Sequence, residues 1–424
     1  MPGRSGHRSP QEPMREPQSR KLIYVTNPAV TAPAPVGWTP QIALANCFPG
    51  TAELRRAIEP EIQALGVRLD REEASGRDTS CLRQVLRELR WRLEYTADAH
   101  GIRATFDRLR ALGAAPPGIV PPGEDGSFGI CTDVWFLKLD ESVDHMLAPD
   151  FDDRGRPPRF LDRMNDPRRL KDYLDNLLVS SLAEDGIDRR KELNFATADL
   201  LRLILWRRPP NYPWDKRLEA VIRKFVAEWQ DPISGFFGGI YLIDGRRVRT
   251  VDLSLTFHMA RYLDGKIEYW PELIDTLMSI RDDRYPNGWL DENGLTSHNN
   301  YDVAILFQLG WPKMRPDQRR RAAQELGRLT DWCLTTAIAA DGKILARAAS
   351  ESLPESYYFT VAFLDTVGYF EPAKRFWTDR QFLEAPALRA RLERQLSALP
   401  KGDPMVRMAR ERLSRSVAAA KQSG

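Results

Sequence analysis

A repeat of about 50 residues constrains the fold of this 424-residue chain more than any other feature. Turn signals that contain glycine recur every 49 to 60 residues, at Gly126, Gly186, Gly235, Gly288 and Gly342. After each of the last four turns, a segment with helical hydrophobic spacing begins, and a second such segment usually follows. A unit of this length with two helices is an αα-hairpin, so the pattern predicts a chain of repeated helical hairpins.

The two helices of each unit differ in composition. The first is apolar nearly all round, which is typical of a helix surrounded by protein, and the second is amphipathic and charged, as expected of a helix that faces water. Hairpins of this kind can close into an α/α toroid, and an all-α toroid is the predicted fold class. An open helical solenoid is the alternative, because repeats alone do not show closure. The expected inner helices span 194–206, 252–263, 301–310 and 357–368, and the outer ones 216–230, 270–281 and 316–339.

The predicted organisation has four parts. Residues 1–20 form a disordered tail, 21–122 an N-terminal arm with helices, 123–380 the toroid body, and 381–424 a set of charged C-terminal helices. The helices of the second part are expected at 51–65, 78–97 and 100–112. Strand signals are few, and residues 239–243 and 247–251 are predicted to form one hairpin across Asp244 and Gly245.

The charge balance excludes some classes of partner. The chain carries 62 basic and 59 acidic residues, so it has no excess charge for nucleic acid or an acidic membrane surface. No apolar run approaches the ~20 residues of a membrane-spanning helix, and no secretory leader is visible. We therefore expect a cytoplasmic protein. The four cysteines, Cys47, Cys81, Cys131 and Cys333, lie far apart and are expected to be reduced, mostly buried thiols.

No cofactor or metal motif is present. The sequence holds no P-loop, no glycine-rich dinucleotide turn and no G-x-S-x-G nucleophile elbow. Its five histidines and four cysteines are not at metal-ligand spacing. We therefore expect neither a bound cofactor nor a metal.

Two motifs resemble those of known toroid enzymes. Residues 230–238, QDPISGFFG, resemble the Gln-x-Pro-x-x-Gly-aromatic turn of terpenoid cyclases and protein prenyltransferases, and the corresponding turn of unsaturated glucuronyl hydrolases. Residues 298–303, HNNYDV, are similar to the Asn/His-rich stretch before a Tyr-Asp-Val helix in alginate-lyase-like toroids. The resemblance implies the α/α toroid fold and an enzyme. The sequence lacks the Asp-x-Asp-Asp acid expected of one class of terpene cyclases, since residues 281–283 read RDD.

The candidate site centres on residues 289–302, WLDENGLTSHNNYD, at the start of a predicted inner helix. His298 and Tyr301 are the predicted proton-transfer groups, and Asp252 and Asp302 are the predicted catalytic carboxylates. Other polar and aromatic residues near inner helices are predicted to bind substrate. These are Asn299, Asn300, Asp291, Glu292, Trp289, His258, Arg249, Tyr357 and Tyr358.

Structural roles are the alternative for many of these residues. Asn299, Asn300 or Asp252 could cap a helix, and Asp291 with Glu292 could form a turn. His258 lies inside an apolar helix and could be a hydrogen-bonded core residue. The arginine-rich segment 389–415 is interpreted as a solvated helical tail.

Three functions remain open from the sequence. The leading hypothesis is a carbohydrate-active enzyme that cleaves or modifies a glycan or oligosaccharide, by lyase or glycoside-hydrolase chemistry. The alternatives are a terpenoid-cyclase-like or prenyltransferase-like enzyme acting on an isoprenoid, and a non-enzymatic helical-repeat scaffold. The expected partner is a small-molecule or oligosaccharide substrate, with no nucleic acid and no membrane span.

Overall fold

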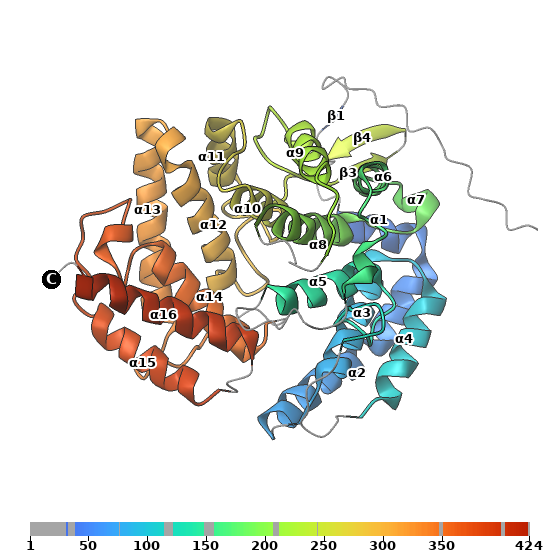
Figure 1. The fold of residues 1–424 in the computed structure, drawn as a ribbon, viewed down its shortest axis with the longest axis horizontal. Coiled ribbons are helices and arrows are strands. Elements are labelled where there is room, and N and C mark those ends of the chain that lie inside the picture. The colour runs from blue at the N-terminus through green and yellow to red at the C-terminus, as the bar shows by residue number, and fades with distance from the viewer. Residues whose placement is uncertain are drawn as a thin grey trace, which may run out of the picture.

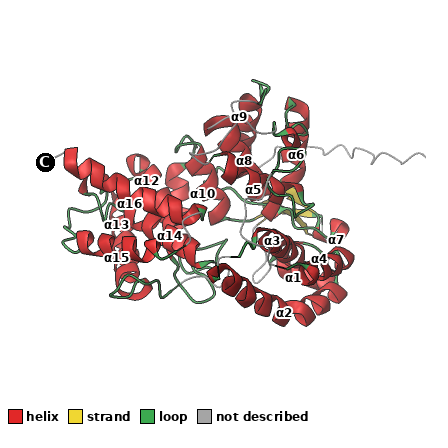
Figure 2. Cartoon of the chain, turned by 60° about the horizontal axis from the view of Figure 1, so that its bottom comes forward, coloured by secondary structure: helices red, strands yellow, loops and turns green. Residues whose placement is uncertain are grey.

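The computed structural model describes most of the chain, and most of what it describes is helical (Figures 1 and 2). The predicted tail at 1–20 lies outside the described residues. The described ranges are 31–32, 39–75, 77–113, 122–147, 157–206, 212–243, 245–346, 351–399 and 403–422.

The N-terminal third forms its own helical layer. Helices α1 (Pro40–Cys47) and α2 (Pro49–Ala74) precede a hairpin of α3 (Ser80–Tyr95) and α4 (Ala99–Ala111). Apolar side chains of α2, α3 and α4 form a separate small core. The three helices predicted for this region are confirmed.

The remaining helices come in pairs, as the repeat predicts. The pairs are α5 (Trp135–Met146) with α6 (Pro167–Leu177), α8 (Arg190–Leu201) with α9 (Leu218–Trp229), α10 (Leu253–Tyr262) with α11 (Trp270–Ser279), α12 (Ser297–Gly310) with α13 (Pro316–Trp332), and α14 (Leu353–Thr366) with α15 (Ala385–Ser397), before the final α16 (Pro404–Gln422). A four-residue α7 (Leu182–Asp185) and two π-helical turns, η3 (Arg202–Trp206) and η5 (Cys333–Ala337), complete the main elements, with 3-10 turns η2 (Arg159–Leu161), η4 (Trp311–Lys313) and η6 (Pro372–Lys374).

The first helices of the pairs form an inner series. Helix α8 packs against α5 and α10, α10 against α12, α12 against α14, and α14 against α16, and Figure 1 shows this order running across the molecule. Their side chains are largely buried, as at Leu200 and Val303, whereas α13 exposes charged residues such as Arg320. The predicted contrast between inner and outer helices is therefore confirmed.

One small sheet lies beside α6 and α9 (Figure 1). Strands β3 (Ile240–Ile243) and β4 (Arg246–Arg249) form the predicted antiparallel hairpin, with Ile240 opposite Arg249. The short strands β1 (Thr31–Ala32) and β2 (Val179–Ser180) add in parallel to β4 and β3, which gives the order β1-β4-β3-β2.

The QDPISGFFG turn has a structural role in this fold. The Gln230 amide nitrogen donates to the carbonyl oxygens of Gly235 at 2.8 Å and Glu268 at 2.7 Å, and its amide oxygen accepts from the Glu268 backbone N–H at 2.9 Å. Gly235 has φ +71°, and a Cβ there would lie 2.4 Å from the backbone nitrogen of Leu273. The motif therefore joins the turn after α9 to the start of α11.

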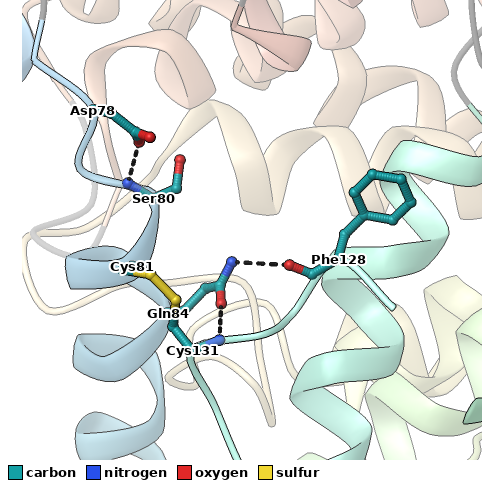
Figure 3. The surroundings of a disulfide bond; sticks show 6 residues. All are labelled: Asp78, Ser80, Cys81, Gln84, Phe128 and Cys131. Carbon is teal, nitrogen blue, oxygen red and sulfur yellow. Dashed lines mark hydrogen bonds between the residues drawn. A yellow bond between two sulfur atoms is a disulfide. The ribbon is translucent and has the colours of Figure 1, made fainter. Parts of the chain in front are cut away.

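The expectation of four reduced thiols is wrong. Cys81, at the start of α3, forms a disulfide with Cys131 in the segment before α5 (Figure 3). Gln84 supports the same contact, because its amide oxygen accepts from the Cys131 N–H at 2.9 Å. The two cysteines are 50 residues apart in sequence, so only the tertiary packing brings them together. Of the other two, Cys47 is exposed and Cys333 is buried.

The C-terminal helices belong to the main core. Apolar residues of α15 and α16, such as Leu392 and Val406, share one cluster with α10, α12 and α14. The interpretation of 389–415 as a solvated tail is therefore wrong for its inward-facing side. None of the helices in the described ranges is long and apolar enough to cross a membrane.

Candidate acid–base site

A buried ion pair joins the first turns of α8 and α10. The Arg190 guanidinium donates to both carboxylate oxygens of Asp252, at 2.6 and 3.0 Å. Asp252 is also the N-cap of α10 and accepts from the Leu255 backbone N–H at 2.9 Å. Because its lone pairs are engaged by a guanidinium and a helix end, Asp252 is held as a structural carboxylate rather than a reactive one.

His258 is a neutral imidazole with a fixed tautomer. The Asn194 amide nitrogen donates to Ser254 Oγ at 2.9 Å, which leaves the Asn194 oxygen to accept from His258 Nδ1 at 2.7 Å. Nε2 is then the unprotonated nitrogen, and no described residue bonds to it. Burial, together with the positive charges of Arg261 and His298, lowers the pKa of His258 well below its ordinary value.

His298 is pushed in the opposite direction. It lies in the first turn of α12, stacked on the Phe359 ring at 4.0 Å between centroids. Its Nδ1 is 3.3 Å from a Glu351 carboxylate oxygen, and its Nε2 is 4.0 Å from Asp302. Burial alone would lower the pKa of His298, but Glu351 and Asp302 outweigh burial and raise it. The protonated form of this imidazole is therefore favoured.

Asp302 is a buried carboxyl beside that imidazole. Its side chain is 1% exposed, and one of its oxygens accepts from the Tyr285 hydroxyl at 3.3 Å. The other oxygen has no partner among the described residues. Burial raises the pKa of Asp302 to about 7 against the opposing charges of His298 and Arg261, so this carboxyl titrates near neutral pH.

Two guanidiniums converge on a pair of tyrosines beyond His298. Arg412 of α16 donates to the Tyr301 hydroxyl at 3.2 Å, and burial raises the pKa of Tyr301. The Arg412 guanidinium also lies 5.7 Å from the ring centroid of Tyr358 on α14. Burial opposes ionisation of Tyr358, but the two guanidiniums outweigh it and lower the pKa below its ordinary value.

These groups lie together between the inner helices, and some of them remain partly accessible. Burial raises the pKa of Asp144 on α5, although 41% of its side chain is accessible. Burial is also the largest influence on the pKa of His298, which is 30% exposed. We refer to this partly accessible group of side chains between the inner helices as the recess. Two hollows lie elsewhere, one beside α1 and α2 and one between η5 and the start of α15.

The structure brings part of the predicted site together. His258, His298, Tyr301, Asp302 and Tyr358 gather on three adjacent inner helices, and Asp252 lies at the end of this group through its bond to Arg190. Asn299 and Asn300 do not join them.

The asparagines point away because of helical phase. Asn300 lies two residues after His298 on α12, which turns it by about 200°. Its oxygen and nitrogen are buried without a partner in the described structure. Asn299 instead donates to the Trp289 carbonyl at 2.9 Å. Neither asparagine caps the helix, because α12 begins four residues before the predicted start and Thr296 accepts from the Asn299 backbone N–H at 3.2 Å.

Five predicted binding residues have other surroundings. Trp289 and Tyr357 are buried in the main core. Arg249 donates to the Trp229 carbonyl at 2.8 Å at the end of α9. Asp291 and Glu292 form a turn closed by hydrogen bonds between Asp291 and Gly294, and Glu292 is exposed.

Sequence reasoning missed four important residues. Arg190 and Arg261 are charged residues in otherwise buried helices, a signal that could have been used. Glu351 lies before α14 in a polar segment and carries no distinct signal. Arg412 is one of many arginines in its helix, and only the packing of α16 on α14 turns it inward.

Comparisons with protein-family models, with curated proteins and with solved structures found no match. Within the described ranges, no group of three or more His, Cys, Asp or Glu side chains could hold a metal ion. The geometry and charge of this site are therefore the basis for assigning a function.

Proposed function

We propose that this chain is an acid–base enzyme that cleaves a uronate-containing glycan by β-elimination in the recess. The observation that carries the proposal is the pair of imidazoles with opposite pKa shifts. His258 has a lowered pKa and a free Nε2, whereas His298 has a raised pKa and an Nε2–H. Two titratable groups whose surroundings separate their pKa values in this way are suited to act as base and acid in one reaction.

The elimination divides naturally between these residues. His258 Nε2 accepts the proton at C5 of the uronate, the electron pair forms the C4=C5 double bond, and the C4–O bond breaks. The His298 Nε2–H donates a proton to the leaving glycosidic oxygen. Arg261 lies one helical turn after His258 and stabilises the negative charge that develops next to C5. Asp302 and Glu351 hold His298 in its protonated form.

Hydrolysis is less well supported by this arrangement. A glycosidase needs two carboxyl groups about 5–10 Å apart on opposite sides of the bond. Asp252 is engaged by Arg190, while Asp302 and Glu351 flank the same imidazole. Asp144 and Asp199 both pair with one guanidinium, that of Arg202, so these carboxyls also lie on one side of a shared partner and fit hydrolysis less well.

An isoprenoid cyclase is disfavoured by charge. Cyclisation passes through carbocations, which require aromatic or anionic walls. Arg202, Arg261 and Arg412 all contact tyrosine rings of the recess, and their positive charges would destabilise a carbocation at close range.

The inner helix series supports an α/α toroid as the fold of this enzyme. Each inner helix from α5 to α16 packs on the next, and the side chains of the site come from α8, α10, α12, α14 and α16. In a toroid, such positions converge on one central recess, which is the arrangement that the proposed reaction needs.

The test is incubation of the full chain with a panel of uronate-containing oligosaccharides of defined linkage, with neutral oligosaccharides as controls. We expect ultraviolet absorbance from a new C=C bond, and a slower reaction when C5 carries deuterium. His258→Gln and His298→Gln should each reduce turnover by about a hundredfold or more.

His100→Gln is the matched control, because His100 is an exposed histidine on α4. If the products show new reducing ends but no ultraviolet absorbance, the reaction is hydrolysis and the proposed elimination is wrong. Full turnover in both recess variants would refute the assignment of the two histidines.

A further inference from the structure

Arg261 is a positive charge of the recess that has no ion-pair partner among the described residues. The described residues give it no ion pair, whereas Arg190 has Asp252 and Arg202 has Asp144 and Asp199. Its guanidinium lies over the rings of Phe257, Tyr262 and Tyr301, 5.4 to 5.5 Å from each ring centroid. An aromatic enclosure holds a cation in place without neutralising it.

Arg412 adds a second guanidinium from the C-terminal helix. Its carboxylate partner is Asp365, at 3.3 Å. The same carboxylate also accepts from Lys374 at 2.7 Å. Lys374 also pairs with Glu371 at 3.1 Å, so these two cations and two carboxylates form one network. The Arg412 side chain is 25% exposed, so a ligand in the recess can reach it.

Both guanidiniums lie beside the same tyrosine ring. The guanidinium carbons of Arg261 and Arg412 are 5.5 and 5.7 Å from the centroid of the Tyr301 ring, and Arg412 donates to the Tyr301 hydroxyl at 3.2 Å. Arg412 is also 5.7 Å from the ring centroid of Tyr358, and the two guanidiniums lower the pKa of Tyr358 although burial opposes this, so this point carries positive potential. An anion placed here would meet two charge-assisted donors.

We propose that Arg261 and Arg412, which both lie beside the Tyr301 ring, form a binding site for an anionic group, a carboxylate or a sulfate ester of the ligand. The inference rests in part on the proposed function, since it names the acidic group by which a glycan would be held. It goes further, because small anions should bind at this site without any glycan. It also makes α16, the last helix of the chain, a supplier of a ligand-binding residue.

The experiment measures the melting temperature of the full chain in sulfate, in succinate and in chloride at equal ionic strength. Sulfate or succinate should stabilise the wild-type protein more than chloride does. The larger of the two effects identifies sulfate ester or carboxylate as the preferred group. Arg412→Met and Arg261→Met should each weaken the binding of that anion by about tenfold to a hundredfold.

Arg410→Met is the matched control, because Arg410 is an exposed arginine on the same helix. Its anion affinity should equal that of the wild type. If a recess variant does not fold, trace modification of the wild-type protein with phenylglyoxal decides instead, since bound anion should protect Arg261 and Arg412 but not Arg410. Equal stabilisation of wild type and Arg412→Met, or no stabilisation beyond chloride, overturns the proposal.

The two proposals fail separately. If the protein binds anions but cleaves no glycan, the anion site is supported and the elimination is refuted. If the protein cleaves a glycan at a rate that Arg412→Met does not change, and binds no anion, the histidine pair is supported and the anion site is refuted.

Discussion

Replacing Asp302 with asparagine should stabilise the protein at alkaline pH and impair its activity. Burial raises the pKa of this carboxyl from 3.8 to about 7 in the folded state. The folded chain therefore binds the Asp302 proton more tightly than the unfolded chain, and the free energy of unfolding falls as pH rises from about 4 to about 7. Asparagine has no proton to lose, so the variant lacks this fall.

The magnitude follows from the two pKa values. Each pKa unit corresponds to about 1.4 kcal/mol, so ionising Asp302 costs the folded state about 4 kcal/mol at pH 8 but only about 1.5–2 kcal/mol at pH 5. The advantage of Asp302→Asn should therefore grow by about 2–3 kcal/mol between these pH values. Any constant loss, such as a weaker bond to Tyr285, cancels in this difference. The loss of charge beside His298 acts in the same direction, because it also reduces proton uptake on folding.

The assay is urea unfolding at pH 5 and pH 8, followed by tryptophan fluorescence. Glu228→Gln is the control, because Glu228 is a carboxylate on α9 with 65% of its side chain exposed, and its effect should not depend on pH in this range. Turnover of the proposed substrate should fall by about tenfold or more, since His298 loses a group that favours its protonated form. An equal effect of Asp302→Asn on stability at both pH values would refute the reasoning.

Three further predictions concern the framework of the site. Arg190→Met should lower the free energy of unfolding by about 3–5 kcal/mol because it leaves the Asp252 carboxylate buried and unpaired; adding Asp252→Leu should restore part of it, and a double variant no more stable than the single one would contradict this. Ultraviolet titration should show one tyrosine that ionises below the ordinary pKa near 10, and Tyr358→Phe should remove that step; its persistence in the variant would disprove the assignment. Replacing Cys81 and Cys131 with alanine should cost about 2–4 kcal/mol, and an unchanged melting temperature would show that the bond adds nothing.

The helices were largely predictable because their signals are local. Apolar runs of helical length predicted the bounds of α8, α10, α12 and α14 to within a few residues. The start of α12 was not predictable in the same way. Residues 297–300 are Ser-His-Asn-Asn, which favour turns over helix in isolation, and their burial against α14 and the Trp289 carbonyl decides the conformation.

The site was predictable only where a polar residue interrupts an apolar helix. His258 and Asp302 carry that signal, and so does Arg261, which the sequence pattern also marks. Separating His298 from Asn300 needed only the 100° step of the helix. Arg412 could not be chosen among its neighbours, because its role depends on which face of α16 packs against α14.

The charge arrangement couples ligand binding to the strength of the base. His258 is neutral partly because Arg261 and His298 place positive charge around it. An anionic group bound by Arg261 would cancel part of that charge, and the pKa of His258 would then rise towards neutrality. A base with a higher pKa removes a proton more readily, provided that it stays unprotonated. The acidic side of the pH profile of kcat gives the pKa of the base in the enzyme–substrate complex, and that of kcat/KM gives its pKa in the free enzyme. We therefore expect this acid limb to lie at higher pH for kcat than for kcat/KM. The two limbs should coincide in Arg261→Met. Coincident limbs in the wild-type enzyme would mean that the anion does not bind beside the base.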